Sequence, residues 1–215
     1  MKYFLAFYGA FLIIGGGLLL LFAKEDLFLE LNSLNTAVGD LAFPYITCLG
    51  EGYFSVLLVL FFLFYRYSYA LISAISFIFT GIAVQFLKHI VFSDVLRPLK
   101  HFEGIADIHT VAGVGMHSFF SFPSGHSAGA FSLFFMICLI LSGKRKFFGV
   151  FLFLLAMLTG YSRIYLGQHF PVDVYAGSII GVGFTWLTYW AVNRSELAKK
   201  PWANKSLIIR SKTLT

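Results

Sequence analysis

The sequence predicts an all-α fold, a polytopic membrane helical bundle, on two observations. Hydrophobic residues make up 59% of the 215 residues and charged residues only 12%, and the mean hydropathy is +0.83. Several apolar stretches approach or exceed the roughly 18 residues that cross a bilayer as a helix, too long for the alternating strands of a barrel. This composition excludes an ordinary soluble domain. We therefore expect one domain, residues 1–215, with about six transmembrane helices.

The first predicted span covers Tyr3–Ala23, which is apolar apart from its glycines. A cleaved signal peptide is the competing interpretation, because a single lysine precedes the apolar run. The sequence lacks a small-x-small cleavage site before Lys24, so we favour a membrane helix that stays in the protein.

Residues 24–52 are mixed in character. Glu25, Asp26 and Glu30 are followed by apolar residues at spacings of two to four. This pattern fits an amphipathic helix that lies on the bilayer surface. A plain connecting loop fits the periodicity equally well.

The other five spans are predicted from apolar runs, at Tyr53–Tyr65, Tyr69–Phe92, Ser127–Leu141, Phe147–Tyr165 and Val172–Val192. Arg66 interrupts the apolar sequence, so the second and third spans form a hairpin. Residues 93–122 are polar, contain glycines and have no sustained period, which is typical of a long functional loop, here an active-site loop. The tail, residues 193–215, is polar and basic, and we expect it to be cytoplasmic and frayed.

The distribution of charge predicts the orientation. The helix ends assigned to one side carry eleven cations and a single acid, Glu196; the cations are Lys2, Arg66, Lys144, Arg145, Lys146, Arg194, Lys199, Lys200, Lys205, Arg210 and Lys212. The opposite side carries the other five cations and nine acids. By the positive-inside rule the first side is cytoplasmic. We expect a multi-pass protein of the bacterial inner membrane whose polar clusters face the periplasm or the exterior.

The sequence predicts neither nucleic-acid binding nor a disulfide bond. The net charge of +6 comes from cations scattered between apolar spans rather than gathered on one face, so we expect no nucleic acid. Cys48 and Cys138 fall in a surface segment and a membrane helix, so we expect no disulfide between them. Membrane lipids are the expected surroundings, and the sequence does not indicate an oligomeric state.

A first polar cluster, Pro123-Ser124-Gly125-His126, stands where a loop becomes the fourth span. Backbone amides at a helix start are unpaired and carry a partial positive charge, so Ser124 and Gly125 are candidates for holding a phosphate oxygen. Gly125 would let the backbone come close to it. His126, on the first turn, is a candidate general acid. A simple helix cap at Ser124 is the alternative.

A second polar cluster lies where the fifth span ends and the sixth begins. His169 and Asp173 are four residues apart, so the carboxylate can hold one imidazole nitrogen and leave the other free to attack phosphorus. A capping aspartate with a surface histidine is the alternative. Arg163 lies at the outer end of the fifth span, where a cation is by default a functional-site candidate.

A third piece lies upstream, at Lys88 and Arg97-Pro98. Snorkelling to the interface would explain Lys88, and an ordinary loop charge would explain Arg97. With Arg163, however, the two complete a three-cation clamp for the negative charge of a pentacoordinate phosphorus.

The three pieces resemble the signature motifs of the type 2 phosphatidic acid phosphatase family, relatives of the vanadium haloperoxidases. Pro123-Ser124-Gly125-His126 matches the second motif. Ser162-Arg163, followed by five residues, His169, three residues and Asp173, matches the third. The first motif usually has six residues between its Lys and its Arg-Pro, whereas eight separate Lys88 from Arg97. The two extra residues require a bulge or a longer loop.

The resemblance implies a metal-independent phosphatase without a cofactor, in which His169 is the nucleophile, Asp173 its orienting partner and His126 the acid. It also implies a set of phosphate-binding residues, namely Lys88, Arg97, Ser124, Gly125 and Arg163. The expected reaction is hydrolysis of a lipid phosphomonoester or diphosphate at the outer leaflet through a phosphohistidine. Candidate substrates are prenyl diphosphate, phosphatidylglycerol phosphate, phosphatidate and lipid A phosphate. A lipid phosphotransferase, or a non-catalytic lipid-phosphate binder or transporter, remains an alternative.

Three further histidines, His101, His109 and His117, lie in the polar loop. Their spacing to Glu103 and Asp107 fits no compact metal-ligand motif, so we expect no metal site. Loop polarity explains them. Contact of His101 and His109 with a substrate headgroup is a further hypothesis.

Overall fold

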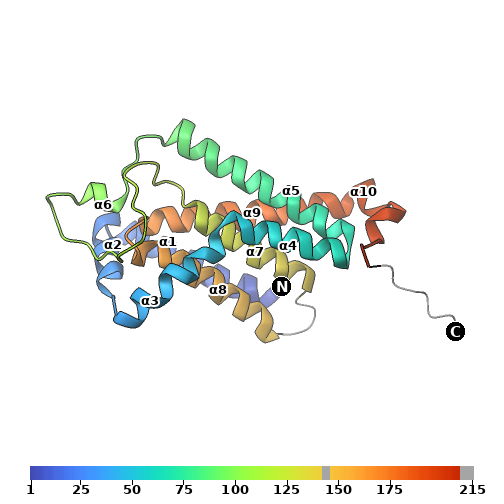
Figure 1. Cartoon of the computed structure of the whole chain (residues 1–215), viewed down its shortest axis with the longest axis horizontal. Coiled ribbons are helices and arrows are strands. Elements are labelled where there is room, and N and C mark those ends of the chain that lie inside the picture. Colours follow the sequence, from blue (N-terminus) through green and yellow to red (C-terminus); the bar gives the residue numbers. More distant parts are fainter. Residues whose placement is uncertain (142–145, 209–215) are drawn as a thin grey trace.

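The computed structural model describes residues 1–141 and 146–208, and all regular elements in these ranges are helices. The predicted all-α class is confirmed. In this part of the chain six helices have 14 or more residues, and each matches one predicted span (Figure 1); they are α1 (Lys2–Leu21), α4 (Gly52–Tyr65), α5 (Tyr67–Phe86), α7 (Gly125–Leu141), α8 (Lys146–Tyr165) and α9 (Pro171–Arg194).

Not every one of these helices is long and apolar enough to cross a membrane by itself. In the described ranges three helices are long and apolar enough, namely α1, α8 and the continuous helix Tyr67–Val91. A fourth span exists if the helix pair Ala37–Gly50 and Gly52–Tyr65, which is bent by 54°, crosses the membrane as one unit. α7 is apolar but shorter, at 17 residues. The chain is therefore a multi-pass membrane protein, and the count of six spans stays a prediction.

The core is centred on α7, which packs against α5, α8 and α9. Phe131, Phe135 and Met136 of α7 are completely buried, in one apolar cluster with Phe4 of α1 and Phe62 of α4. Because α7 is apolar on every side, it takes the central place, as expected for a helix without a polar face. Many large apolar side chains elsewhere point outward, including Ile13, Leu20 and Ile78, which suits contact with lipid tails.

Two glycines let α9 approach α7 closely. A Cβ atom at Gly177 would lie 2.5 Å from the carbonyl oxygen of Ser124, and one at Gly181 would lie 2.3 Å from that of Ala128. Small residues at a contact between membrane helices permit this distance. The close contact brings the start of α9 beside the start of α7, where the second and third sequence motifs lie.

Residues 24–52 are helical, which excludes the plain loop. They form α2 (Lys24–Ser33), α3 (Ala37–Ile46) and the 3₁₀ turn η1 (Thr47–Gly50), in place of one helix. The break lies at residues 34–36, where the side chain of Thr36 caps α3 by accepting a hydrogen bond from the amide of Gly39. Cys48 and Cys138 are free thiols.

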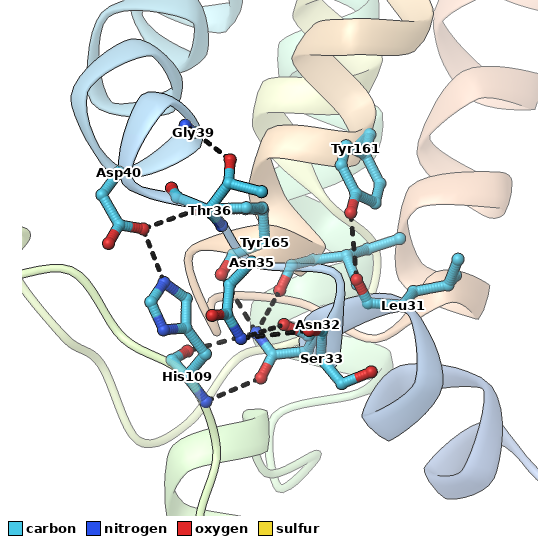
Figure 2. Close-up of polar contacts among 11 residues, drawn as sticks. Leu31, Asn32, Ser33, Asn35, Thr36, Gly39, Asp40, His109, Tyr161 and Tyr165 are labelled. Carbon is cyan, nitrogen blue, oxygen red and sulfur yellow. Dashed lines mark hydrogen bonds and ion pairs between the residues drawn. The ribbon is translucent and has the colours of Figure 1, made fainter.

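Residues 93–122 form the predicted loop, with one short helix, α6 (Pro98–His101). The loop is tied to α2 and α8 through the buried side chain of Asn32 (Figure 2). Asn32 Nδ2 donates to the carbonyl oxygens of His109, at 3.1 Å, and Tyr165, at 3.0 Å, and Asn32 Oδ1 accepts from the amide of His109 at 2.7 Å. The loop path is therefore fixed by hydrogen bonds rather than by regular structure.

The side chain of His109 contributes to the same attachment. Its Nε2 lies 2.7 Å from Oδ1 of Asp40 on α3, and that oxygen also accepts from the hydroxyl of Tyr165 at 2.6 Å. His101 similarly lies 3.4 Å from Glu25 of α2. Both imidazoles thus contact carboxylates of the neighbouring helices, which gives them a structural explanation without a substrate headgroup.

The expectation of a frayed tail is wrong for residues 193–208. α9 continues to Arg194 and is followed by α10 (Glu196–Lys199) and the turn η3 (Pro201–Asn204). The amide of Tyr67 donates to the carbonyl of Lys205, and the amide of Leu207 to that of Leu63, both at 2.9 Å. These bonds attach the segment to the turn between α4 and α5.

Some residues used for the orientation prediction lie outside the described residues. They are Lys144 and Arg145, together with the charges in residues 209–215.

Candidate active site

A cavity of about 690 Å³ receives side chains from all three sequence motifs. The predicted site residues on its wall are Lys88, Arg97, Gly125, His126, Arg163 and His169. The other two, Ser124 and Asp173, are buried behind that wall. The folded chain therefore brings the predicted site residues, which are spread between positions 88 and 173, to one place, as the site hypothesis requires.

His169 and Asp173 form a buried pair in which Nδ1 of the imidazole lies 3.3 Å from Oδ2 of the carboxylate. The same oxygen accepts from the amide of Phe170 at 3.0 Å and from the hydroxyl of Ser121 at 2.5 Å. Asp173 therefore caps α9 and contacts the histidine at once. The alternative of a surface histidine is wrong, because His169 is buried. With Nδ1 held, Nε2 is the nitrogen available for chemistry.

The environment of His169 favours a neutral ring. Burial lowers the pKa of its imidazole well below the ordinary value, and the positive charges of Arg97, Arg163 and Lys88 lower it further. A neutral imidazole keeps the lone pair that a nucleophile needs. The site thus combines cations, suited to an anionic ligand, with an imidazole that stays unprotonated beside them, as a candidate nucleophile requires.

The turn before α9 brings His169 back to Arg163. The amides of Gln168 and His169 both donate to the carbonyl oxygen of Arg163, at 2.9 and 3.1 Å. Gly167 lies between them with φ of +67°, in the left-handed region that favours glycine. This local geometry explains the spacing of the third motif, since a helix end and one reversal separate its Arg from its His.

The two arginines are buried and oriented by the protein. Arg97 donates from Nε to the carbonyl of Phe119 and from Nη1 to Oε1 of Gln168, both at 3.0 Å, so it is no free loop charge. Arg163 donates from Nη1 to Thr47 Oγ1 at 2.5 Å, and its buried Nε has no hydrogen-bond partner in the described ranges. A buried cationic donor without a partner on a cavity wall is suited to an anionic ligand.

Lys88 lies in the π-helical turn η2 (Leu87–Val91), which extends α5. The amide of Phe92 donates to the carbonyl of Leu87, five residues back, at 2.8 Å. A π turn holds more residues than an α turn, so part of the longer spacing between Lys88 and Arg97 is taken up here as a bulge. Both residues still reach the same cavity.

The hydroxyl oxygen and the amide of Ser124 form hydrogen bonds within the protein. Its Oγ accepts from the amide of Ser127 at 3.3 Å and from Ser127 Oγ at 2.9 Å, and its own amide donates to the carbonyl of Asp173 at 3.0 Å. Ser124 therefore acts as the cap of α7 and links the second motif to the third. Gly125, next in the chain, lies on the cavity wall and offers its backbone there.

The structure adds residues to the site that the motifs do not contain. Glu51, at the start of α4, places Oε1 2.8 Å from Nε2 of His126. Ser121 and Thr47 hold Asp173 and Arg163, and His117 of the loop lies on the cavity wall. An acid directly before an apolar span was the only sequence signal for Glu51.

The family model for the PAP2 superfamily matches residues 69–197, which include all three motifs. The chain belongs to this superfamily. The resemblance inferred from the motifs is thereby confirmed, and the PAP2 match covers α5 to α9 and the loop between them.

Several named relatives are phosphatases, and one, of Bacillus licheniformis, is named a bacitracin transport permease; it is 40% identical over 70 residues, which cover 33% of this chain and 32% of the relative. The chain is 37% identical over 100 residues to a lipid A 4'-phosphatase of Bacteroides thetaiotaomicron, an alignment that covers 46% of this chain and 43% of the relative. The chain thus spans less than half the length of this curated relative.

Two solved PAP2 structures share the fold. The crystal structure of Aquifex aeolicus LpxE matches with a TM-score of 0.67 and 28% identity, over 77% of this chain and 93% of that one. A transmembrane PAP2 type phosphatidylglycerolphosphate phosphatase from Bacillus subtilis matches with a TM-score of 0.64 and 24% identity, over 90% and 98%. The second likeness concerns the fold alone.

Proposed function

We propose that this PAP2 protein is a metal-independent lipid phosphatase that acts through a phosphohistidine. The observation that carries the proposal is the buried His169–Asp173 pair, which opens onto a cavity lined by Lys88, Arg97 and Arg163. A binder or transporter of lipid phosphates would need the cations. It would not need a neutral nucleophile held by a carboxylate.

In the first step Nε2 of His169 donates its lone pair to phosphorus. The bond between phosphorus and the lipid oxygen breaks, its electron pair stays on that oxygen, and His126 supplies the proton that completes the alcohol. Asp173 holds the Nδ1 proton and stabilises the positive charge that the ring acquires. The products of this step are the lipid alcohol and phosphohistidine.

In the second step a water molecule takes the place of the alcohol. His126, now neutral, accepts a proton from the water as its oxygen bonds to phosphorus. The phosphorus–nitrogen bond breaks, and its electron pair returns to Nε2 of His169. Inorganic phosphate leaves, and His126 is again protonated for the next cycle.

The negative charge of both transition states falls on the oxygens of the phosphoryl group. Lys88, Arg97 and Arg163, together with the backbone at Gly125, supply the stabilising charge and donors in a largely buried site, where they are worth more than in water. These groups take the role that a divalent cation has in other phosphatases.

The wall of the cavity favours a lipid over a soluble ester. Beside the polar residues it includes apolar side chains of α4 and α5, among them Val56, Leu60, Phe77 and Ile78. A substrate with its phosphate at the helix ends and its tail in the bilayer fits this division. Lipid A phosphate, prenyl diphosphate, phosphatidylglycerol phosphate and phosphatidate all meet this requirement. The charge distribution supports an inner-membrane site that faces the periplasm.

Phosphate release by the purified protein in detergent tests the proposal. The four lipid phosphates are compared in EDTA, with His169→Ala alongside and vanadate as inhibitor. We expect release from at least one lipid, unaffected by EDTA, blocked by vanadate and reduced at least about 1,000-fold in the variant. Lack of release from every lipid, or equal release by His169→Ala, would refute the proposal and turn attention to transfer or transport.

A further inference from the structure

The carboxylate of Glu51 forms a second histidine–carboxylate pair in the cavity. Its Oε1 lies 2.8 Å from Nε2 of His126, and both residues line the cavity wall. The pair differs from His169–Asp173 in being partly exposed, with 26% of the His126 side chain and 45% of the Glu51 side chain accessible. Glu51 belongs to none of the three motifs.

The backbone fixes Glu51 relative to His126. A Cβ atom at Gly50 would lie 2.6 Å from the carbonyl oxygen of His126, and one at Gly129 would lie 2.8 Å from that of Gly50. The end of η1 is thus pressed against the first turns of α7, at a distance that only glycines permit. Thr47, in the same 3₁₀ turn, holds Arg163. The segment 47–51 therefore contacts both a phosphate-binding cation and the candidate acid.

The charges around His126 make an acidic neighbour important. Burial opposes a proton on its ring, and so do the positive charges of Arg163, on α8, and Lys88, in the π turn of α5, whereas Glu51 favours one. His169 faces it from the turn before α9, and the carboxylate of Asp173 is committed to His169. In the described part of the chain Glu51 is the acid in contact with His126, so it counters burial and the cations in part.

We propose that Glu51 is the positioning residue of His126, which favours the protonated imidazole and orients it to donate to the leaving lipid oxygen. Glu51 accepts the hydrogen bond of Nε2–H, which leaves Nδ1–H to face the lipid. When the phosphorus–oxygen bond breaks, the Nδ1 proton moves to the lipid oxygen and Glu51 stays ionised. In the second step water returns a proton to Nδ1. This inference rests on the proposed function, because it assumes that His126 is the general acid.

The chemistry of the leaving group separates this role from a structural one. A nitrophenolate leaves without a proton, whereas an alkoxide requires one. We therefore compare kcat/KM of Glu51→Gln on p-nitrophenyl phosphate and on dodecyl phosphate, since kcat/KM reports the steps up to phosphohistidine formation. The expected loss is about 100-fold on dodecyl phosphate and less than about threefold on p-nitrophenyl phosphate. A general disturbance of the site would lower both.

Two reference variants complete the experiment. His126→Ala is expected to show the same dependence on leaving group, and Glu25→Gln, which removes a carboxylate paired with His101 outside the cavity, is expected to match the wild type on both substrates. Suppose that the loss of kcat/KM in His126→Ala depends on the leaving group. An equal loss on both substrates in Glu51→Gln, or no loss on either, would then overturn the role of Glu51 alone. A His126→Ala without such dependence would overturn the role of His126 and that of Glu51 with it.

Discussion

The hydroxyl of Ser121 donates a 2.5 Å hydrogen bond to Oδ2 of Asp173, a residue 52 positions further along the chain. The same oxygen contacts Nδ1 of His169. Ser121 lies near the end of the 93–122 loop, directly before the second motif, so this loop and the start of α9 share one buried carboxylate. The loop therefore takes part in orienting the candidate nucleophile, although the nucleophile lies in a different motif.

Replacing Ser121 with alanine should slow the reaction. The change removes one of three contacts to Asp173 Oδ2, a bond to a charged acceptor worth about 1.5 kcal/mol, and we expect kcat/KM to fall about tenfold. Lipid phosphate release by the purified variant is the measurement. Ser93→Ala, in the same loop but with its hydroxyl bonded to Asp94, is the matched control and should match the wild type. Unchanged activity in Ser121→Ala would show that the carboxylate is held well enough without it.

Replacing Asp173 with asparagine separates its cap function from its function at His169. The side-chain oxygen of asparagine can still accept from the amide of Phe170 at the start of α9, so the melting temperature should change little. The neutral amide cannot stabilise a charged imidazole, and kcat should fall about 1,000-fold or more. Thermal unfolding and kcat are measured on the same preparation. A large loss of stability with a proportionate loss of activity would mean that Asp173 is mainly structural.

The depressed pKa of His169 predicts activity below the ordinary pKa of a histidine. Because the neutral ring is the nucleophile, the acid limb of kcat/KM due to His169 should lie below pH 6.5. Arg97→Gln removes one of the positive charges that lower this pKa, so the limb should move to higher pH in the variant. The substrate phosphate ionises near pH 6. Its contribution to the pH profile is the same for both proteins, so it cancels when the two profiles are compared. A limb at the same pH in both would contradict the electrostatic explanation.

His109 should matter for stability and not for substrate choice. Its imidazole contacts Asp40 on α3, so His109→Ala should loosen the 93–122 loop and lower the melting temperature. The ranking of the four lipid phosphates should stay the same. Thermal unfolding measures the stability, and phosphate release from the four lipids measures the substrate ranking. His117→Ala is measured alongside as the comparison variant, because His117 lies on the cavity wall. A changed ranking in His109→Ala would restore the headgroup hypothesis.

The sequence predicted the long helices and the three motifs well, for physical reasons. Apolar runs such as Phe147–Tyr165 have few alternatives to a helix in a membrane. The motif spacings encode local geometry: His169 and Asp173 are one helical turn apart, and Gly167 allows the reversal that returns the chain to Arg163. Such features depend on residues close together in the chain, so they can be predicted from the sequence pattern.

Other features depend on contacts between distant segments, which leave no local pattern. Glu51 meets His126 across 75 residues, and as a lone acid before an apolar run it has no periodicity to mark it. Lys205 and Leu207 are ordered by backbone bonds to the α4–α5 turn, which composition cannot reveal. At Ser124 the sequence allowed a cap or a phosphate ligand, and only the partners of its hydroxyl and amide show the cap.

Direct trapping of the phosphorylated enzyme tests the central claim most directly. Purified protein is mixed with a ³²P-labelled lipid phosphate, quenched within milliseconds in alkali and analysed for label on the chain. We predict a label on the wild type that is stable in base and released by acid, as expected of phosphohistidine, that is absent from His169→Ala and lies on residue 169. A label on His169→Ala, or rapid lipid hydrolysis by the wild type without any trapped label, would contradict the phosphohistidine mechanism.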